Sequence, residues 1–324
     1  MKVSTSFLFR LTAAILLTLQ LAAAHAWPER TVRLVVPAPA GGAFDVIARL
    51  FAEHLAKEVG QSVIVENKPG GGGTIAVGAV LAAPPDGHTL LLTGSNILTE
   101  IPHLIRPPYD TMKDLRAFPP LAKFRFILVG APDLPARDMD SLAKFLQASP
   151  GKSSFASGSP GTFSHYSGEI LNQRFGADMQ HIPFAGAPPA LVAVMSHHVT
   201  IYLDGVVTSA PMLRAGKVKA FGIAGTTRHP QLPDLPTFLE QGYPELSNFI
   251  NTLFAAANSK VPAPVIARIE ALSQKIAASP AFRARVNEAG FEPAEAMSGE
   301  QFARQLQSDH AWAGNFARKL KLSQ

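Results

Sequence analysis

The segment VVPAPAGGAFDVIARLF, residues 35–51, joins an apolar run to a stretch with helical spacing through a pair of glycines. A strand that stops at Gly41 and Gly42 and restarts as a helix leaves backbone N–H groups pointing into one small space, which suits an anion. The stretch from Ala40 to Gly42 also lets the backbone approach a ligand closely, because glycine has no side chain. The junction therefore predicts an anion-holding loop.

Two side chains accompany this first loop. Asp45 stands where a helix N-cap is expected, so its carboxylate either caps the helix or contacts a polar or cationic part of a ligand. Phe44 places a phenyl ring beside the glycine pair, where the ring either lines the pocket or packs into the helix. The sequence leaves both pairs of alternatives open.

A second loop has matching chemistry. The segment SGSPGTFSH, residues 157–165, also lies between an expected strand and an expected helix. It offers the hydroxyls of Ser159 and Thr162 and the N–H groups of Gly161 and Thr162. We therefore predict that this loop holds the same anion as the first, with His165 as a further candidate contact.

Two other expected strands end in polar residues. Ser95 follows the run LLLTG, and Asp204 ends the apolar run IYLD. Asp204 either lines a cleft at the mouth of the sheet or caps the helix that follows, and the sequence does not separate the two. Both residues are candidate ligand contacts.

The second loop also resembles the nucleophile elbow G-x-S-x-G, with Ser157 in place of the first glycine. A hydrolase that uses Ser159 would need a histidine base and an acid, and nothing in the sequence places a histidine near it. Pro160 also removes the N–H that normally donates to the oxyanion. A cleft hydrolase is the less favoured alternative to a binding protein.

The sequence predicts neither a metal nor a cofactor. The motif at 71–76, G-x-G-x-x-A, passes a loose dinucleotide test, but it follows the second expected strand and no acidic residue ends a strand about 20 positions later. A glycine-rich surface turn is the preferred interpretation. The ten histidines show no metal-ligand spacing.

Apolar periodicity indicates the elements that position these loops. Strands are predicted over 31–36, 62–66 and 88–93, with helices over 46–59 and 74–83. After a proline-broken stretch over 101–120, strands are predicted over 124–129, 153–156, 179–182, 199–203 and 218–224, with helices over 139–148, 163–175, 189–195 and 206–215. A strand over 249–257 precedes a tail that is almost wholly helical from Pro262.

This alternation predicts an α/β protein with two parallel-rich sheets flanked by helices. The helical tail cannot form its own sheet, so we expect it to pack on the first unit. The predicted domains are a discontinuous domain 1 over 27–122 and 226–324 and an inserted domain 2 over 123–225. Ligands bind outside the carboxyl ends of the strands in such sheets, which places the candidate loops on two sides of one cleft.

The N-terminus predicts export. Lys2 and Arg10 precede an apolar stretch over 11–24, and Ala24-His25-Ala26 has the small-x-small pattern of a cleavage site. We predict a signal peptide over 1–26, cleaved after Ala26. An uncleaved membrane anchor is the alternative, but the run is short against the ~20 residues of a membrane span.

Composition narrows the class of protein. At 324 residues, with 47% hydrophobic and 16% charged residues, the chain is globular and too long for one small core. An exported chain without cysteine relies on that core, which suits a bacterial periplasm. Without the signal peptide, 27 basic and 24 acidic residues remain, and no basic stripe suggests a nucleic-acid partner.

Ordered blocks along the chain resemble one family. VVPAPAGGAFDVIARLFAEHL, VENKPGGGG, APPDGHTLLLTGS and PPYDTMKDL are followed by SGSPGTFSHYSGEIL, HIPFAGAPPAL and RHPQLPDLPTFLEQGYP. Together they resemble the tripartite tricarboxylate transporter receptors, the Bug family of periplasmic solute-binding proteins. The resemblance implies a type II-like periplasmic-binding-protein fold, with two α/β domains that close on a carboxylated solute. It also implies that the loops at Ala40–Gly42 and Ser157–Thr162 hold the carboxylate, partly through ordered water.

The sequence departs from the usual pattern of that family at five positions. Ala38 stands where an aromatic residue is frequent, and Phe44 where a small hydroxyl residue is frequent. Phe184-Ala185 replaces a common Tyr-Lys pair, and Pro160 replaces a frequent asparagine. These changes leave the carboxylate-holding backbone intact but disfavour the usual small aliphatic diacids.

We therefore predict a periplasmic receptor that captures a small organic carboxylate and performs no chemistry. The departures favour a solute with an apolar or aromatic body. The predicted partners are that solute and the permease subunits of a membrane transporter, and the receptor is expected to be a monomer. A ligand-sensing receptor for a signalling partner is a further alternative.

Overall fold

The order of strands and helices follows the predicted alternation closely. The structure is a computed structural model that describes residues 27–148 and 150–319. The predicted signal peptide lies outside the described residues. Within them, no helix is long and apolar enough to cross a membrane. The helix α7, Phe163–Phe175, has the predicted bounds, which confirms that element.

One half of the molecule is built on parallel strands near the N-terminus. β1 (Val32–Val36) lies between β2 (Val63–Asn67) and β3 (Thr89–Gly94), and both pairs are parallel. β9 (Ile250–Asn258) then pairs antiparallel with β3, and the short β10 (Glu292–Pro293) pairs with β4. Four of the five residues of β1 are completely buried (Val32, Leu34, Val35 and Val36), as a parallel sheet covered by helices on both faces requires.

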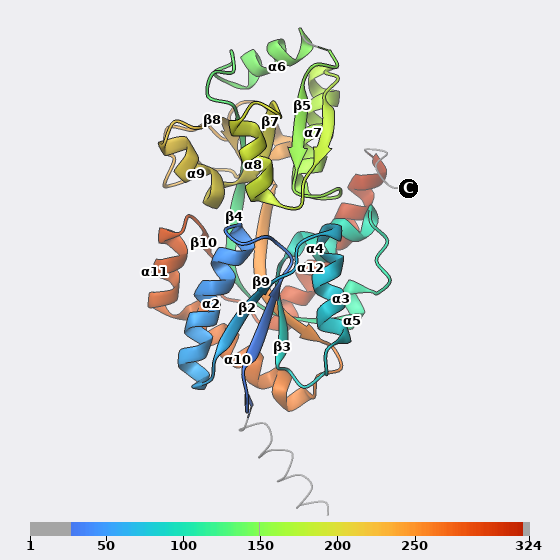
Figure 1. Cartoon of the computed structure of the whole chain (residues 1–324), viewed down its shortest axis with the longest axis vertical. Coiled ribbons are helices and arrows are strands. Elements are labelled where there is room, and N and C mark those ends of the chain that lie inside the picture. Colours follow the sequence, from blue (N-terminus) through green and yellow to red (C-terminus); the bar gives the residue numbers. More distant parts are fainter. Residues whose placement is uncertain (1–26, 149, 320–324) are drawn as a thin grey trace, which may run out of the picture.

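The other half has its own set of parallel strands. β5 (Ser154–Ser157) lies between β6 (Gln180–Pro183) and β7 (Ile201–Gly205), and both pairs are parallel. β7 and β8 (Lys219–Ile223) pair antiparallel with β4. The helices here are α6 (Met139–Gln147), α7, α8 (Ala187–Met195) and α9 (Val206–Arg214). Figure 1 shows this half above the first one.

The strand β4 (Leu115–Gly130) belongs to both halves. Its first part pairs with β9, and its last part pairs with β7 and β8. The sequence predicts a proline-broken loop up to Pro120, and this prediction is wrong. Pro119 and Pro120 stand where the pairing with β9 shifts register on both sides of Pro120, and strands tolerate proline at such irregularities.

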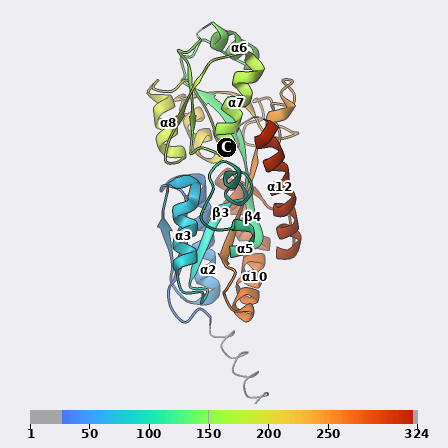
Figure 2. The same cartoon turned by 90° about the vertical axis from the view of Figure 1, so that its right-hand side faces the viewer.

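The C-terminal helices pack back on the first half. α10 (Ala263–Ala278) and α11 (Pro280–Glu288) contact α2 (Ala43–Val59), and α12 (Gly299–Lys319) contacts α4 (Ser95–Thr99) and β4. Figure 2 shows α12 standing along one side of this half. The remaining short elements are α3 (Thr74–Ala82), α5 (Thr111–Asp114) and the 3-10 turns η1 (Gly71–Gly73), η2 (Ile101–His103) and η3 (Pro244–Leu246).

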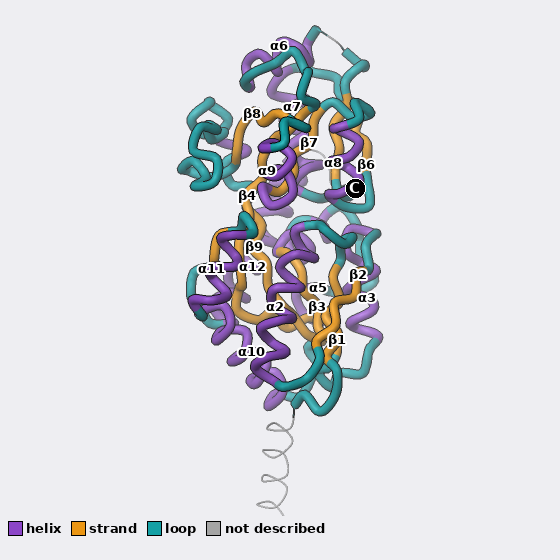
Figure 3. Tube along the Cα trace, turned by 60° about the vertical axis from the view of Figure 1, so that its left-hand side comes forward, coloured by secondary structure: helices purple, strands orange, loops and turns teal. Residues whose placement is uncertain are grey.

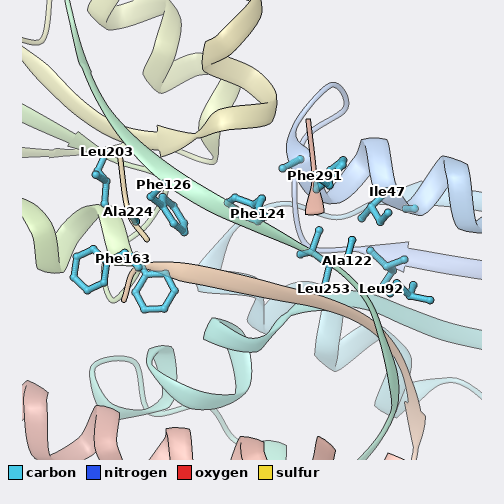
Figure 4. Close-up of a cluster of buried hydrophobic side chains, with 14 of the residues drawn as sticks. Ile47, Leu92, Ala122, Phe124, Phe126, Phe163, Leu203, Ala224, Leu253 and Phe291 are labelled. Atoms are coloured by element: carbon cyan, nitrogen blue, oxygen red, sulfur yellow. The ribbon is translucent and has the colours of Figure 1, made fainter. Parts of the chain in front are cut away.

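A mixed α/β fold with a curled sheet between helices results (Figure 3). The domain boundaries stay a prediction, and the one placed after residue 122 falls inside the continuous strand β4. A single hydrophobic cluster follows β4 through both halves, from Ile47 and Leu92 past Phe124 to Leu203 (Figure 4). The shared strand and shared core therefore connect the two halves.

The start of α2 differs from the prediction in a way that matters for the site. The helix begins at Ala43 rather than Val46, and its N-cap is Gly42. Asp45 is therefore the third helical residue and does not cap the helix. The helix ends as predicted at Gly60, whose left-handed backbone lets its N–H bond to the carbonyl of Ala56.

A buried carboxyl group lies away from the strand ends, beside α12. Glu100 follows α4, is only 5% exposed, and accepts a hydrogen bond from the Thr99 hydroxyl. Burial raises the pKa of Glu100 to about 8, and the nearby carboxylate of Asp309 adds to the effect. The native state therefore keeps a proton that the unfolded chain has already lost at neutral pH.

This pKa shift predicts a pH-dependent stability. An unfolded glutamate ionises around pH 4.5, so between that pH and about 8 the native state binds the extra proton and is progressively destabilised. Glu100→Gln should remove this dependence. Between pH 5 and pH 8 the free energy of unfolding of the variant should rise relative to that of the parent protein by up to a few kcal/mol, at about 1.4 kcal/mol per pKa unit. Urea unfolding of both proteins at the two pH values measures the difference.

The matched control is Glu300→Gln, which makes the same change on the exposed first turn of α12. It should shift the unfolding free energy equally at both pH values. If the unfolding free energies of Glu100→Gln and of the parent protein change equally with pH, Glu100 is ionised in the native state.

Candidate ligand-binding site

A cavity of about 480 Å³ lies where the two halves meet. Residues that follow the carboxyl ends of six parallel strands line it. From the first half these are Pro37 after β1, Gly70 after β2 and Asn96 after β3. From the second half they are Gly158 after β5, Phe184 after β6 and Gly205 at the end of β7. The cavity therefore occupies the position at which open α/β sheets bind ligands.

The first predicted loop contributes Gly42 and Phe44 to the cavity wall. They belong to the N-terminus of α2, where the first N–H groups of a helix have no partner within the helix. The positive end of the helix dipole adds to the attraction for an anion. Ala40 and Gly41 lie outside the wall and are exposed.

Asp45 holds this loop together from behind. Its carboxylate accepts a hydrogen bond from the Gly41 N–H at 2.9 Å and from Asn67 at 3.0 Å, and it forms a two-pronged ion pair with Arg49. Burial alone would raise the pKa of Asp45, but the bonds from Arg49, Gly41 and Asn67 outweigh it and lower the pKa. Asp45 does not line the cavity, and the Gly41 N–H is already used.

The second predicted loop contributes Ser159 and Thr162, together with Gly158, Pro160 and Ser164. Thr162 is the N-cap of α7, and its hydroxyl donates to the Ser159 carbonyl at 2.7 Å. The first N–H groups of α7 therefore face the same cavity as those of α2. The Ser159 hydroxyl donates to the Pro160 carbonyl at 3.3 Å.

Two other predicted contacts of this loop are used internally. The Gly161 N–H donates to Nδ1 of His165 at 3.2 Å, and neither residue lines the cavity. The His165 ring stacks on the His181 ring with 4.1 Å between centroids. Burial, with a smaller contribution from His181, lowers the pKa of His165 to about 4. His165 is therefore a neutral ring that supports the loop.

Ser95 supports the floor of the cavity rather than lining it. It is 7% exposed, and its hydroxyl donates to Oδ1 of Asn251 at 3.1 Å. Asn251 in turn donates to Asn96 at 2.8 Å, and both asparagines line the cavity. No local pattern predicts this pair, because Asn251 is 155 residues from its partner in the chain.

Asp204 lines the cavity at the end of β7 and is 1% exposed. Its Oδ2 accepts hydrogen bonds from the Thr208 and Ser209 hydroxyls, both at 2.6 Å. Burial raises the pKa of Asp204 to about 6, although these hydroxyls oppose the shift. The N-cap of α9 is Gly205 and not Asp204. Asp204 faces the cavity and is bonded to the start of α9 through the hydroxyls of Thr208 and Ser209.

An aromatic wall closes one side. Phe44 is half-buried, lines the cavity and meets Phe124 edge-on with 6.3 Å between ring centroids. Phe126, at 5.0 Å from Phe124, and Phe184 extend the wall. The ring of Phe44 thus reaches the cavity and also packs against the core.

The glycine run at 70–73 belongs to the cavity and is not a surface turn. It was predicted as a surface turn, but all four glycines line the cavity, and Gly72 and Gly73 are buried. A side chain at Gly73 would collide with Ile97, at 2.6 Å from its Cβ. The signal available in the sequence was the run of four glycines directly after a strand, which indicates close backbone approach.

The cavity wall carries no cationic side chain among the described residues that form it. Its ionisable groups are Asp204 and Tyr202, and no cluster of potential metal ligands occurs in the described parts of the chain. An anion in this cavity would therefore be held by backbone N–H groups, hydroxyls and amides.

The comparisons with known proteins agree with this geometry. The model of the tripartite tricarboxylate transporter family receptor matches residues 47–322. The chain belongs to this receptor family. Among curated relatives, protein BugT of Bordetella pertussis is 33% identical over 224 residues, which cover 68% of this chain and 69% of BugT. A UPF0065 protein of Pseudomonas sp. strain P51, from the tcbD-tcbE intergenic region, is 33% identical over 79% of this chain and 76% of its own length.

Solved structures of the family superimpose well. The periplasmic binding protein BugD is 29% identical with a TM-score of 0.86, over 92% of this chain and 99% of BugD. MatC of Rhodopseudomonas palustris, solved with bound malate, is 30% identical with a TM-score of 0.83, over 90% of this chain and 99% of MatC. An R. palustris protein solved with adipate has a TM-score of 0.86 at 25% identity, over 92% and 99% of the two chains. The two-domain binding-protein fold is therefore confirmed.

All five departures from the usual family pattern line the cavity. These residues are Ala38, Phe44, Pro160, Phe184 and Ala185. The wall also contains the N-termini of α2 and α7, and Asp204 of β7. The positions at which the resemblance leads us to expect a departure from the family pattern are therefore cavity positions.

The two halves touch at the rim of the cavity. A Cβ on Gly186, at the N-cap of α8, would lie 2.5 Å from Cδ of Pro39 in the first half. A Cβ on Gly72 would lie 3.4 Å from the Ser159 hydroxyl oxygen, and one on Gly161 would lie 3.5 Å from Cα of Ile101. In this structure the two halves are therefore in contact at the rim, and glycines permit the contact.

This contact predicts a variant that resists closure. Gly186→Ala should push Pro39 away and lower solute affinity by about tenfold or more, since closure is needed to surround the solute. Small-angle scattering with saturating solute should show a larger radius of gyration for the variant than for the parent protein.

A second substitution separates the collision from backbone strain at Gly186, whose φ is 128°. The double variant Gly186→Ala with Pro39→Ala removes the ring that is hit and should regain most of the affinity. If the second change restores nothing, the loss comes from the backbone of Gly186 and not from a blocked closure.

Proposed function

We propose that this chain is the periplasmic receptor of a tripartite tricarboxylate transporter and captures a small organic carboxylate with an apolar or aromatic body. The observation that carries the proposal is the cavity between the halves, which faces the N-termini of α2 and α7 and an aromatic wall. Malate and adipate in related structures support a carboxylate as the solute.

The helix N-termini supply the carboxylate contacts in this proposal. Unpartnered N–H groups and the positive dipole end favour an anion without any side-chain charge. Gly42 and Thr162, the N-caps of the two helices, lie on opposite halves and line the same space. One carboxylate held from both sides would link solute capture to closure. Ala40, Gly41, Asp45, Ser95, Gly161 and His165 then act by supporting these loops.

The aromatic wall selects the body of the solute. Phe44 and Phe124 offer ring surface, which gains roughly 25 cal/mol for each Å² of apolar area removed from water. A citrate-like solute would leave additional polar groups against this wall, at a cost of ~1–3 kcal/mol for each unpaired group. The proposed solute is therefore less polar than the diacids typical of the family.

A hydrolytic role has less support. Two described histidines bond to serines, and neither serine is Ser159. His181 lies 2.7 Å from the hydroxyl of Ser157, which is completely buried, and Nδ1 of His198 lies 2.7 Å from the hydroxyl of Ser196, which is outside the cavity wall. Ser159, the candidate nucleophile, faces the cavity but donates to a neighbouring carbonyl. We propose a monomeric receptor that delivers its solute unchanged to membrane permease subunits, after export and cleavage behind Ala26.

A binding screen of residues 27–324 tests the proposal. Benzoate- and nicotinate-like acids should bind more tightly than succinate, glutamate and citrate, and the primary amides of the binding acids should bind at least tenfold more weakly. Calorimetry measures the affinities, and a solute at 100 times its Kd should also stabilise the protein by ~2.7 kcal/mol.

Phe44→Thr tests the wall itself. It should weaken the binding of the best aromatic acid by about 1 kcal/mol, because part of one ring is no longer buried, and leave the binding of succinate nearly unchanged. Tighter binding of citrate or succinate than of every aromatic acid would refute the aromatic preference. Amides that bind as well as their acids would refute carboxylate recognition.

A further inference from the structure

One oxygen in the cavity wall has no hydrogen-bond partner. Oδ2 of Asp204 is saturated by Thr208 and Ser209, whereas Oδ1 accepts no hydrogen bond from any described residue and is fully buried. Buried carboxylate oxygens are almost always paired, because leaving one unpaired costs more than an ordinary unmade bond. The carboxyl group thus presents an unused acceptor at the solute cavity.

The neighbouring donors leave Oδ1 without a hydrogen bond in this structure. The Thr208 hydroxyl also lines the cavity but already donates to Oδ2. The Gly205 N–H and the Tyr202 hydroxyl are both close enough to the carboxyl to favour its charged form, but neither reaches Oδ1 with hydrogen-bond geometry. No arginine, lysine or histidine is found among the described residues of the cavity wall. A donor carried by the solute would fill this acceptor.

We propose that the corner formed by Asp204 and Tyr202 accepts a hydrogen bond from the bound solute, which therefore carries a hydroxyl or amino group besides its carboxylate. This inference rests on the proposed function and names the solute more closely. The helix N-termini take the carboxylate, and the buried acid takes the donor. A bare carboxylate that reached this corner would instead meet a like charge.

The position of the corner indicates where the donor lies on the solute. Asp204 is paired in register with Ile127 on β4, and the next residue, Gly205, is paired with Phe126 of the aromatic wall. A Cβ on Gly205 would lie 3.0 Å from the ring of Phe124. The donor group thus projects from the solute body beside the wall, as a ring substituent does in a hydroxy- or amino-benzoate.

Matched solutes test the inference on residues 27–324. Two sets are compared by calorimetry: benzoate with 4-hydroxybenzoate and 4-aminobenzoate, and succinate with malate and aspartate. A hydrogen bond to a charged group is worth roughly 10- to 100-fold in affinity, so in a set that binds, at least one donor-bearing member should exceed its parent acid by that factor. The two donors within each set distinguish a hydroxyl from an amino group.

Asp204→Asn identifies the group responsible. The amide oxygen can keep the bonds from Thr208 and Ser209, and the amide NH₂ then offers a donor where the solute met an acceptor. The preference for donor-bearing solutes should fall below about threefold, while the parent acids bind as well or better. Ser209→Ala is the control, since it removes one bond to Asp204 at a completely buried position outside the cavity wall and should keep the preference.

The outcomes separate the inference from the proposed function. No binding of any acid would overturn both. Acids that bind without any preference for a donor would overturn only the role of Asp204, and so would a preference that survives in Asp204→Asn. If Asp204→Asn does not fold, the preference of the parent protein within each set still decides for or against the inference.

Discussion

The strand β4 is the constraint on which the rest of the structure depends. Because it pairs with β9 in one half and with β7 and β8 in the other, it connects two sets of parallel strands. Their carboxyl ends converge on one cavity, and the helices that follow begin there. The cluster that includes Phe124 and Phe126 runs along this strand and forms part of the cavity wall (Figure 4). Core and site are therefore built from the same strand.

The cavity combines strong anion-binding geometry with an absence of cationic side chains from its described wall. Helix N-termini offer fixed dipoles that lose no side-chain entropy on binding, so a carboxylate can be selected without a lysine or arginine. Such a site has no positive charge to balance Asp204, and the solute itself is then the natural partner of that acid. Specificity would arise from one acceptor and one aromatic wall.

Much of the fold could be predicted from the sequence, because the spacing of apolar residues and the glycines that end helices are local properties of the chain. The bounds of α7 and the alternation of strands and helices follow from apolar spacing and glycine stops. The early start of β4 was missed, since two prolines are tolerated only where pairing with β9 is irregular, and that depends on a distant strand.

The candidate site was predicted less completely for a related reason. The spacing identified both loops, but it could not show that Asp45 uses the Gly41 N–H or that His165 uses the Gly161 N–H. Hydrogen bonds between side chains and nearby backbone depend on rotamers and helix starts that differ by a residue or two from those predicted. The contributions of Asn251 and of the run at 70–73 depend on tertiary contacts.

A crystal structure of residues 27–324 with a tightly binding acid tests the central claim most directly. The account predicts carboxylate oxygens within about 3 Å of first-turn N–H groups of α2 or α7, directly or through one water, with the solute body against Phe44 and Phe124. A carboxylate held by an arginine or lysine side chain, or a solute bound outside this cavity, would contradict it.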